Sequence, residues 1–427
     1  MKNFKKHKNK VAILVVILII LCVIILFIDR YIPVGNSFPN LPRVEQTVTT
    51  TEDYLADFDY AYEVLKETYP YFEVNKIKSG VDWLANRDKY RAEIAKSKSA
   101  SNFYRRMNLI LGDLHNGHTN IVQEQYGIDN YIIYKRNSPK ASWRADIARQ
   151  YENPKARARY MINNDTIEKY LALENKKTAE GNSKNISVGD IKEDIAYIKV
   201  SVMGQDYEVD EDKKIVLPYL EKIKDYKALV IDIRGNGGGN TNYYEKFLYP
   251  YIASKPYSVK EYDFIKSDRN KKLIKQMYMK KLSEDDIKSF GFPERTNEII
   301  RDFNFYTWYG QEVKPNNDSI RFKGKIYLLV NRGVYSAAEA MASFSKESGF
   351  ATLIGERTGG DGIGFDPMQV LLPNTGYVMK YSYDLGTTES GSVNELEQTT
   401  PDIVCNPDTS GELIDQPCIQ EVLRLEE

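Results

Sequence analysis

The residues of this sequence that could do chemistry begin with a serine at a predicted helix start. Ser336 follows the apolar run "KIYLLV" and opens the alanine-rich stretch "SAAEAMASFSKES". A serine there is well placed to attack an acyl carbon, because free backbone N–H groups and the helix dipole favour developing negative charge. Serine is also a preferred N-cap, and Ser336 with Glu339 has the S-x-x-E spacing of a capping box. The sequence therefore predicts that Ser336 caps its helix and is also a candidate nucleophile.

A serine nucleophile needs a base, and the small number of histidines narrows the choice. The chain has three histidines. His7 lies in the basic N-terminal tail, whereas His115 and His118 share the turn "LGDLHNGHTNI" after an amphipathic helix. Both are candidate bases. A zinc site that combines them with Cys405 and Cys418 is disfavoured, because the spacing of the two cysteines fits no usual zinc pattern. We predict neither a metal nor a cofactor.

A glycine-rich loop is the third feature with chemical meaning. The segment "DIRGNGGGN" places four glycines in five positions, from Gly235 to Gly239. Glycine lets backbone N–H groups approach a ligand closely. The pattern is not the G-x-G-x-x-G of a dinucleotide cradle, and no Lys-Ser/Thr pair indicates a phosphate loop. Together with Ser336, the loop favours an oxyanion hole.

The spacing of apolar residues, which indicates the helices and strands that must position these residues, changes along the chain. Residues 51–125 show apolar side chains at three- and four-residue spacings and predict a helical N-terminal subdomain. Residues 126–185 are polar and predict an irregular insert with a helix or two. From about 186 to 427, strand-like runs alternate with helical ones, which indicates an α/β catalytic domain. Within it, residues 255–318 are charged and predict a helical excursion.

The N-terminus carries the clearest membrane signal. Residues 11–28 are 18 uncharged residues, preceded in residues 1–10 by five lysines. Such a run comes close to spanning a bilayer, and the positive-inside rule places the tail in the cytoplasm. The run is long for a signal peptide and no A-x-A-like site follows it. We therefore expect one transmembrane anchor, a linker at 29–50, and a catalytic domain on the extracytoplasmic side of the cell membrane.

The net charge limits the possible partners, and the cysteine content limits the possible disulfides. The formal net charge of −1 gives no global attraction to nucleic acid, so we predict no nucleic-acid partner. Cys22 lies inside the apolar run, which leaves Cys405 and Cys418. In an oxidising exterior these two could pair and close a small loop.

Several segments together resemble the S41 family of serine peptidases, the C-terminal processing proteases with their tricorn and retinoid-binding relatives. The matching pieces are "LGDLHNGHT", "IAYIKV", "ALVIDIRGNGGG", "GKIYLLVNRGVYSAAEAMA", "LIGERTGG" and "ELEQTTPDI". The resemblance implies a crotonase/ClpP-like ββα core with a helical N-terminal subdomain. It also implies that Ser336 is the nucleophile, with an oxyanion hole from the Ala337 N–H and a glycine of the pair Gly237 and Gly238.

The departures from the family pattern select a branch. The tail-specific branch uses a serine–lysine dyad, whereas "GERTGGDG" has Asp361 where that lysine would stand. The tricorn-like branch instead takes a histidine from the N-terminal subdomain and a glutamate ahead of the final "PD". That analogy implies His118 as the base, with His115 as its rival, and Glu395 as the group that orients the site, with Glu397 as the fallback.

These features predict a membrane-anchored, extracytoplasmic serine endopeptidase that hydrolyses peptide or protein substrates through an acyl-enzyme. Two other functions stay open: a non-catalytic ligand- or peptide-binding protein on the same fold, and an esterase or amidase acting on small molecules. A peptide groove would favour the peptidase, and a small closed pocket would favour the esterase.

Overall fold

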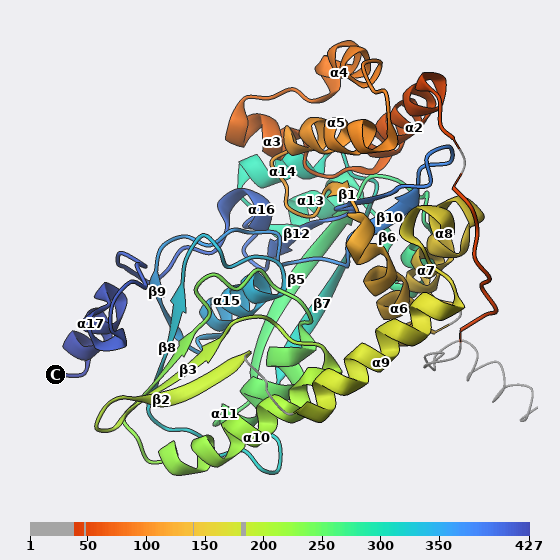
Figure 1. The fold of residues 1–427 in the computed structure, drawn as a ribbon. Coiled ribbons are helices and arrows are strands. Elements are labelled where there is room, and N and C mark those ends of the chain that lie inside the picture. The colour runs from red at the N-terminus through yellow and green to blue at the C-terminus, as the bar shows by residue number, and fades with distance from the viewer. Residues whose placement is uncertain (1–37, 47, 140, 181–184) are drawn as a thin grey trace, which may run out of the picture.

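The computed structural model describes residues 38–46, 48–139, 141–180 and 185–427, and Figure 1 shows that helices and sheets are mixed throughout them. The predicted mixed α/β class is confirmed. The anchor expected at residues 11–28 lies outside the described residues. Across the described ranges, no helix has the length and apolar character that crossing a membrane requires.

A six-stranded sheet forms the centre of the C-terminal half. Its strand order is β13-β9-β8-β4-β3-β2, and all neighbours are parallel except the edge strand β2, which is antiparallel to β3. Every residue of β4 is buried, as expected for a central parallel strand covered on both faces. The strands are β2 (Ile186–Lys192), β3 (Ile195–Val200), β4 (Ala228–Asp232), β8 (Lys325–Val330), β9 (Thr352–Gly355) and β13 (Ile403–Val404).

Helices cover both faces of this sheet. Along β4, Ile231 belongs to the core shared with α10, α11 and α15, whereas its neighbour Val230 belongs to the core shared with α17. This alternation follows from the two-residue period of a strand. The helices are α10 (Asp206–Ile223), η3 (Tyr243–Leu248), α11 (Tyr249–Ile252), α15 (Ala337–Ser348) and α17 (Pro417–Leu425). A disulfide between Cys405 and Cys418 links the end of β13 to α17.

Helices dominate the N-terminal part of the described chain, and the first four lie together at the top of Figure 1. They are α2 (Thr51–Thr68), α3 (Phe72–Ser79), α4 (Arg87–Ile94) and α5 (Ala100–Gly112), with the short turn η1 (Leu84–Asn86) before α4. Their buried faces are rich in aromatic residues: Tyr62 stacks on Trp83, and Trp83 packs against Tyr90. The histidine turn, with His115 and His118, directly follows α5, the last of these helices.

The segment 126–185, expected to be an irregular insert with a helix or two, is mostly helical. It contains η2 (Glu124–Tyr126), α6 (Gly127–Asn137), α7 (Trp143–Glu152), α8 (Pro154–Tyr160) and α9 (Asn164–Glu180). Tyr131, Trp143 and Tyr151 are buried in the same core as the first helices. A few large aromatic side chains supply the packing here. The mostly polar composition of the segment therefore gave little indication of its helices.

The segment 255–318, expected to be a helical excursion, forms much of a second sheet. Strands β5 (Tyr257–Ile265) and β7 (Phe305–Val313) pair antiparallel along their whole length in the order β12-β5-β7-β6. Exposed and less exposed residues alternate along the middle of β7, as the two-residue period of a strand requires. The remaining elements are α12 (Lys271–Gln276), β6 (Lys280–Lys281), α13 (Glu284–Phe290), α14 (Glu294–Ile300) and β12 (Leu385–Thr388).

A three-stranded sheet attaches the histidine turn to the C-terminal half. It has the order β1-β11-β10, with β1 (Asn120–Ile121), β11 (Val378–Tyr381) and β10 (Met368–Leu371). β1 begins two residues after His118, and Asn120 pairs with Lys380 on β11. This pairing fixes the turn beside segments more than 200 residues away in the sequence. Two short helical pieces complete the C-terminal part, α16 (Asn394–Glu397) and η4 (Leu413–Asp415).

Candidate active site

Ser336 lies at the sharp turn between β8 and α15. Its backbone has φ 56° and ψ −126°, and its side chain makes no capping hydrogen bond. Glu339 is fully buried and accepts hydrogen bonds from Asn394 and Thr399 instead of pairing with Ser336. The predicted capping box is therefore wrong. A positive φ in a residue with a Cβ costs about 1–3 kcal/mol, and here it leaves the hydroxyl free.

His118 joins Ser336 to a carboxylate. Its Nε2 lies 3.0 Å from the Ser336 Oγ, and its Nδ1 lies 2.7 Å from Asp361 Oδ2. The ring also packs against Tyr335, with centroids 4.9 Å apart. His115, in contrast, is exposed and its Nδ1 lies 3.0 Å from Asn75 Oδ1 on α3. The structure thus brings His118 to the serine and leaves His115 outside.

Asp361 is the acid of this arrangement, a role that the sequence did not reveal. Burial acts to raise the pKa of Asp361, but the charge of His118 and the hydrogen bonds donated to the carboxylate hold that pKa well below its ordinary value. The donors besides His118 are Tyr71 (2.8 Å, to Oδ1), and Asn116 (2.8 Å), Ser382 (3.0 Å) and Tyr335 (3.1 Å), all to Oδ2. An ionised Asp361 is suited to orient the imidazole and to stabilise its protonated form.

Glu395, expected to orient the site, contacts Lys78 instead. Lys78 Nζ lies 2.8 Å from the Glu395 carbonyl oxygen and 3.1 Å from Oε1, while Oε2 is buried without a donor among the described residues. The backbone of Gly360, next to Asp361, packs against Glu395: a Cβ added at Gly360 would lie 3.4 Å from Glu395 Oε2. Burial and the charge of Asp361 raise the pKa of Glu395 to about 8, against the effect of Lys78.

The fallback acid is also elsewhere. Glu397 is exposed and lies 3.7 Å from Arg295. The signal that could have identified Asp361 was its place in the family pattern, where the lysine of the dyad reaches the serine. The loop that carries Asp361 is held beside Ser336, because the Ser336 N–H donates to the Gly360 carbonyl at 3.3 Å. An ionisable group substituted on this loop therefore still faces the site.

The predicted oxyanion donors are only partly assembled at Ser336. The Ala337 N–H begins α15 and has no recorded acceptor among the described residues. Gly238 packs so closely that a Cβ would come within 2.7 Å of the Ser336 Cβ, but its N–H already donates to Asn236 Oδ1 at 3.0 Å. Gly237 is exposed with open space around it, whereas Gly239 lines the cavity beside the serine. Ala337 and Gly239 both line the cavity, whereas Gly238 is the glycine that packs against Ser336.

A cavity of about 480 Å³ opens in front of the serine. Ser336, His118 and Asp361 line one part of it, loop 362–367, α6 and residues 240–242 line much of the rest, and Arg144 and Asp384 also face it. A second cavity of about 140 Å³ between α6, α9 and the start of α10 shares Ile133, Asn137 and Gln205 with the first. The two cavities are therefore adjacent and share part of their walls.

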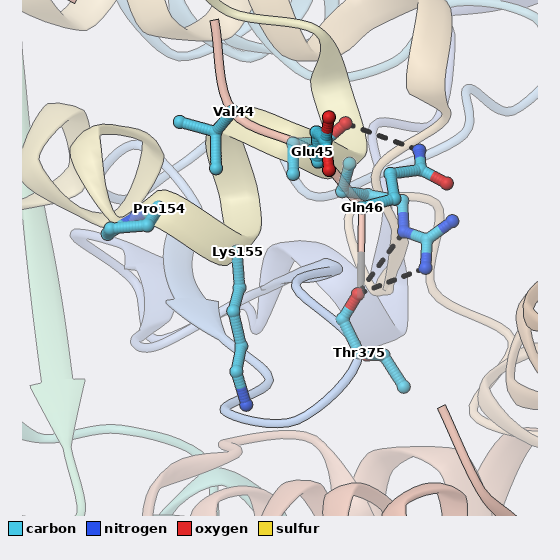
Figure 2. Close-up of a pocket in the computed structure, with 8 residues that line it drawn as sticks. Val44, Glu45, Gln46, Pro154, Lys155 and Thr375 are labelled. Carbon is cyan, nitrogen blue, oxygen red and sulfur yellow. Dashed lines mark hydrogen bonds between the residues drawn. The ribbon is translucent and has the colours of Figure 1, made fainter. Parts of the chain in front are cut away.

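A third hollow, shown in Figure 2, has no part in this site. It lies between residues 44–46 and α8, has a volume of about 70 Å³, and has no serine, cysteine or histidine among its described lining residues. Gln46 donates to the Ala158 carbonyl and Arg159 to the Thr375 carbonyl at its edge, so its polar groups hold the chain segments together. Elsewhere in the described chain, no group of three or more His, Cys, Asp or Glu residues is arranged to hold a metal ion.

A serine, a histidine and an aspartate in one hydrogen-bonded chain have the geometry of the triads that serve acyl transfer. Residues 194–405 match the model of peptidase family S41. The resemblance predicted from the sequence is therefore confirmed, and the chain carries an S41 peptidase domain over these residues. No curated protein matches the chain significantly.

Solved structures agree with the family at the level of the fold. A protein from Parabacteroides merdae, provisionally described as a peptidase, is 15% identical, with 89% of this chain and 97% of that chain covered and a TM-score of 0.55. Mature CPAF in complex with lactacystin is 14% identical, with 83% and 94% covered and a TM-score of 0.51. The tricorn protease is 15% identical, covers 89% of this chain and 37% of its own, and has a TM-score of 0.42. That last value is too low to assign a branch, so the tricorn-like branch stays a prediction.

Proposed function

We propose that this protein is a serine endopeptidase that uses a Ser336–His118–Asp361 triad. The observation that carries the proposal is the continuous chain from the Ser336 Oγ through His118 to Asp361, with contacts of 3.0 and 2.7 Å. Membership of residues 194–405 in a peptidase family supports peptide bonds as the substrate. The cavity of about 480 Å³ in front of the serine, with a second cavity of about 140 Å³ beside it, favours an extended chain over a small ester.

In the proposed mechanism, the Ser336 Oγ attacks the scissile carbonyl carbon while His118 Nε2 takes the hydroxyl proton. Asp361 keeps the other ring nitrogen protonated and stabilises the imidazolium. The imidazolium then gives its proton to the leaving amine, and an acyl-enzyme remains on Ser336. Water activated by the same imidazole releases the acyl group and restores the serine.

The oxyanion of the tetrahedral intermediate would be held by backbone N–H groups. The Ala337 N–H at the start of α15 supplies one donor, and the helix dipole adds to its effect. The second donor comes from the glycine loop, from Gly239 as it stands or from Gly238 after its N–H leaves Asn236. One such donor is typically worth about 2.7–4 kcal/mol of transition-state stabilisation.

We also propose that residues 11–28 anchor the enzyme in the cell membrane with the catalytic domain on the extracytoplasmic side. The uncharged run after five lysines supports this orientation. The disulfide between Cys405 and Cys418 is compatible with an oxidising exterior. When a protease is added to intact cells that express the full chain, it should digest the catalytic domain. A domain that is protected until the cells are broken would refute the orientation.

The test of catalysis is cleavage of an unstructured reporter protein by the full chain in detergent, together with labelling by a fluorophosphonate probe. Ser336→Ala should lose both, and His118→Ala should lower the acylation rate by about a million-fold. His115→Ala is the matched control and should stay within about twofold, because its ring is hydrogen-bonded to Asn75 and not to Ser336 or Asp361.

Ser348→Ala, at the other end of the helix that Ser336 precedes, controls for helix stability, since its hydroxyl donates to the Phe344 carbonyl within the same helix. Labelling that survives in Ser336→Ala, or cleavage that fails in His115→Ala and persists in His118→Ala, would contradict the proposed triad.

A further inference from the structure

The cavity in front of Ser336 has an uneven charge distribution. Its only lysine or arginine among the described lining residues is Arg144, whose Nε lies 2.6 Å from Asp366 Oδ2. His118 is likewise occupied by Asp361. The remaining charged lining residue is Asp384, which is 4% exposed. The cavity therefore contains one carboxyl group without a cation.

Asp384 has a second buried acid behind it. Its Oδ2 accepts the Phe365 N–H at 3.0 Å, and its carboxyl group contacts that of Asp263 on β5. Asp263 is fully buried, and neither of its carboxyl oxygens has a hydrogen-bond donor from the rest of the described chain. Glu261, on the same strand, is also buried and is hydrogen-bonded to Tyr309. No cation from the described protein neutralises this group.

Such an arrangement is unfavourable for ionised carboxyl groups. Buried carboxylates need a cation or several donors, and two that touch share a proton instead of both ionising. Burial accordingly raises the pKa of both Asp384 and Asp263 above the ordinary range. Asp361 satisfies the same requirement internally with His118 and four other donors, whereas the Asp384–Asp263 pair has no internal equivalent.

We infer that Asp384, backed by Asp263, selects substrates with a lysine or arginine side chain in the cavity beside Ser336. This rests on the proposed peptidase function, since the cavity is then the place where the substrate must lie. A cationic side chain would supply the donors that the pair lacks, and hydrogen bonds between charged groups are the strong ones. Asp366 is already neutralised by Arg144 and does not contribute the preference.

The first experiment maps cleaved bonds in an unstructured protein and then compares matched peptides. In each pair, one residue near the cleaved bond is lysine or glutamine, with four positions scanned on each side. We expect one position at which lysine raises kcat/KM by about tenfold or more. Asp384→Asn should reduce that preference to within about twofold, and the control Asp366→Asn should retain it. No lysine-preferring position, or a preference that survives in Asp384→Asn, would overturn the inference.

The second experiment does not depend on turnover. Binding of benzamidinium and of neutral benzamide to the full-length Ser336→Ala protein is measured by calorimetry. We expect benzamidinium to bind at least about tenfold more tightly, and Asp384→Asn in the same background to abolish the difference. Equal binding of the two probes refutes the inference even if Asp384→Asn fails to fold. If neither reporter protein nor peptide is cleaved, the peptidase proposal fails, whereas Asp384-dependent benzamidinium binding would still support the cation site.

Discussion

Two buried acids lie beside the histidine turn, and their surroundings differ. Asp361 receives donors from His118 and from four other side chains, and its pKa lies well below the ordinary value. In Glu395, Oε1 accepts a hydrogen bond from Lys78, whereas Oε2 has no donor among the described residues. The pKa of Glu395 is raised to about 8. Both are almost fully buried, at 9% and 4% exposure, so burial alone does not separate them.

The difference lies in the number of donors. A buried carboxylate stays ionised only where donors replace the lost water. Asp361 meets this condition and can hold the imidazole of His118 in one tautomer, whereas Glu395 favours its neutral form near neutral pH. The residue that resembles a catalytic acid by its place in the sequence is therefore not the one equipped to act as the acid.

The largest expected effect comes from exchanging the charge of Asp361. Asp361→Asn should lower kcat by about 10,000-fold, because the amide cannot stabilise the imidazolium and favours the wrong tautomer. Glu395→Gln, the matched exchange at the other acid, should lower kcat by less than about tenfold. Steady-state kinetics on a peptide substrate measures both, and the reverse order of effects would restore Glu395 as the orienting group.

The next effect concerns stability rather than activity. The raised pKa of Glu395 means that the folded protein binds a proton that the unfolded chain releases above pH 4.5, the ordinary value. The free energy of unfolding should therefore fall between about pH 5 and 8, by up to about 1.4 kcal/mol per pH unit for this group. Glu395→Gln should show a shallower decline in urea denaturation over this range. Parallel curves for the two proteins would mean that Glu395 is ionised when folded.

A smaller effect tests whether individual donors matter at Asp361. Tyr71 is the donor recorded at Oδ1, at 2.8 Å, and Tyr71→Phe removes it. Losing one hydrogen bond to a charged group should lower kcat by about tenfold, with little change in KM. Tyr90→Phe is the control, because Tyr90 donates at 2.7 Å to Asp113, an acid outside the triad. Equal effects of the two exchanges would indicate a general loss of packing.

The smallest effect concerns the strained serine. Ser336→Gly relieves the positive φ and should raise the free energy of unfolding by about 1 kcal/mol, while activity disappears. Ser336→Ala keeps the Cβ and hence the strain, so it should lose activity without gaining stability. Thermal unfolding of both variants distinguishes them. Equal midpoints would show that the turn is not strained.

Parts of the fold followed from the sequence alone, and parts did not. The runs "KIYLLV" and "ALVID" are β8 and β4, because continuous apolar runs between turn signals are typical of buried parallel strands. The three strands of segment 255–318 were missed, because the segment is rich in lysine and other charged residues that favoured a solvated helix. Only one or two of the helices in residues 126–185 were expected, because a few aromatic residues provide the packing of an otherwise polar segment.

The sequence by itself determined that Ser336 follows a strand at a helix start, that a glycine loop follows another strand, and that two histidines share one turn. These are local patterns, which short-range sterics and periodicity encode. Only the tertiary structure decided which histidine and which acid meet the serine. His118 is 218 residues from Ser336 and 243 from Asp361. Their meeting depends on how β1 pairs with β11 and how loop 359–361 packs, and no local pattern specifies such long-range packing.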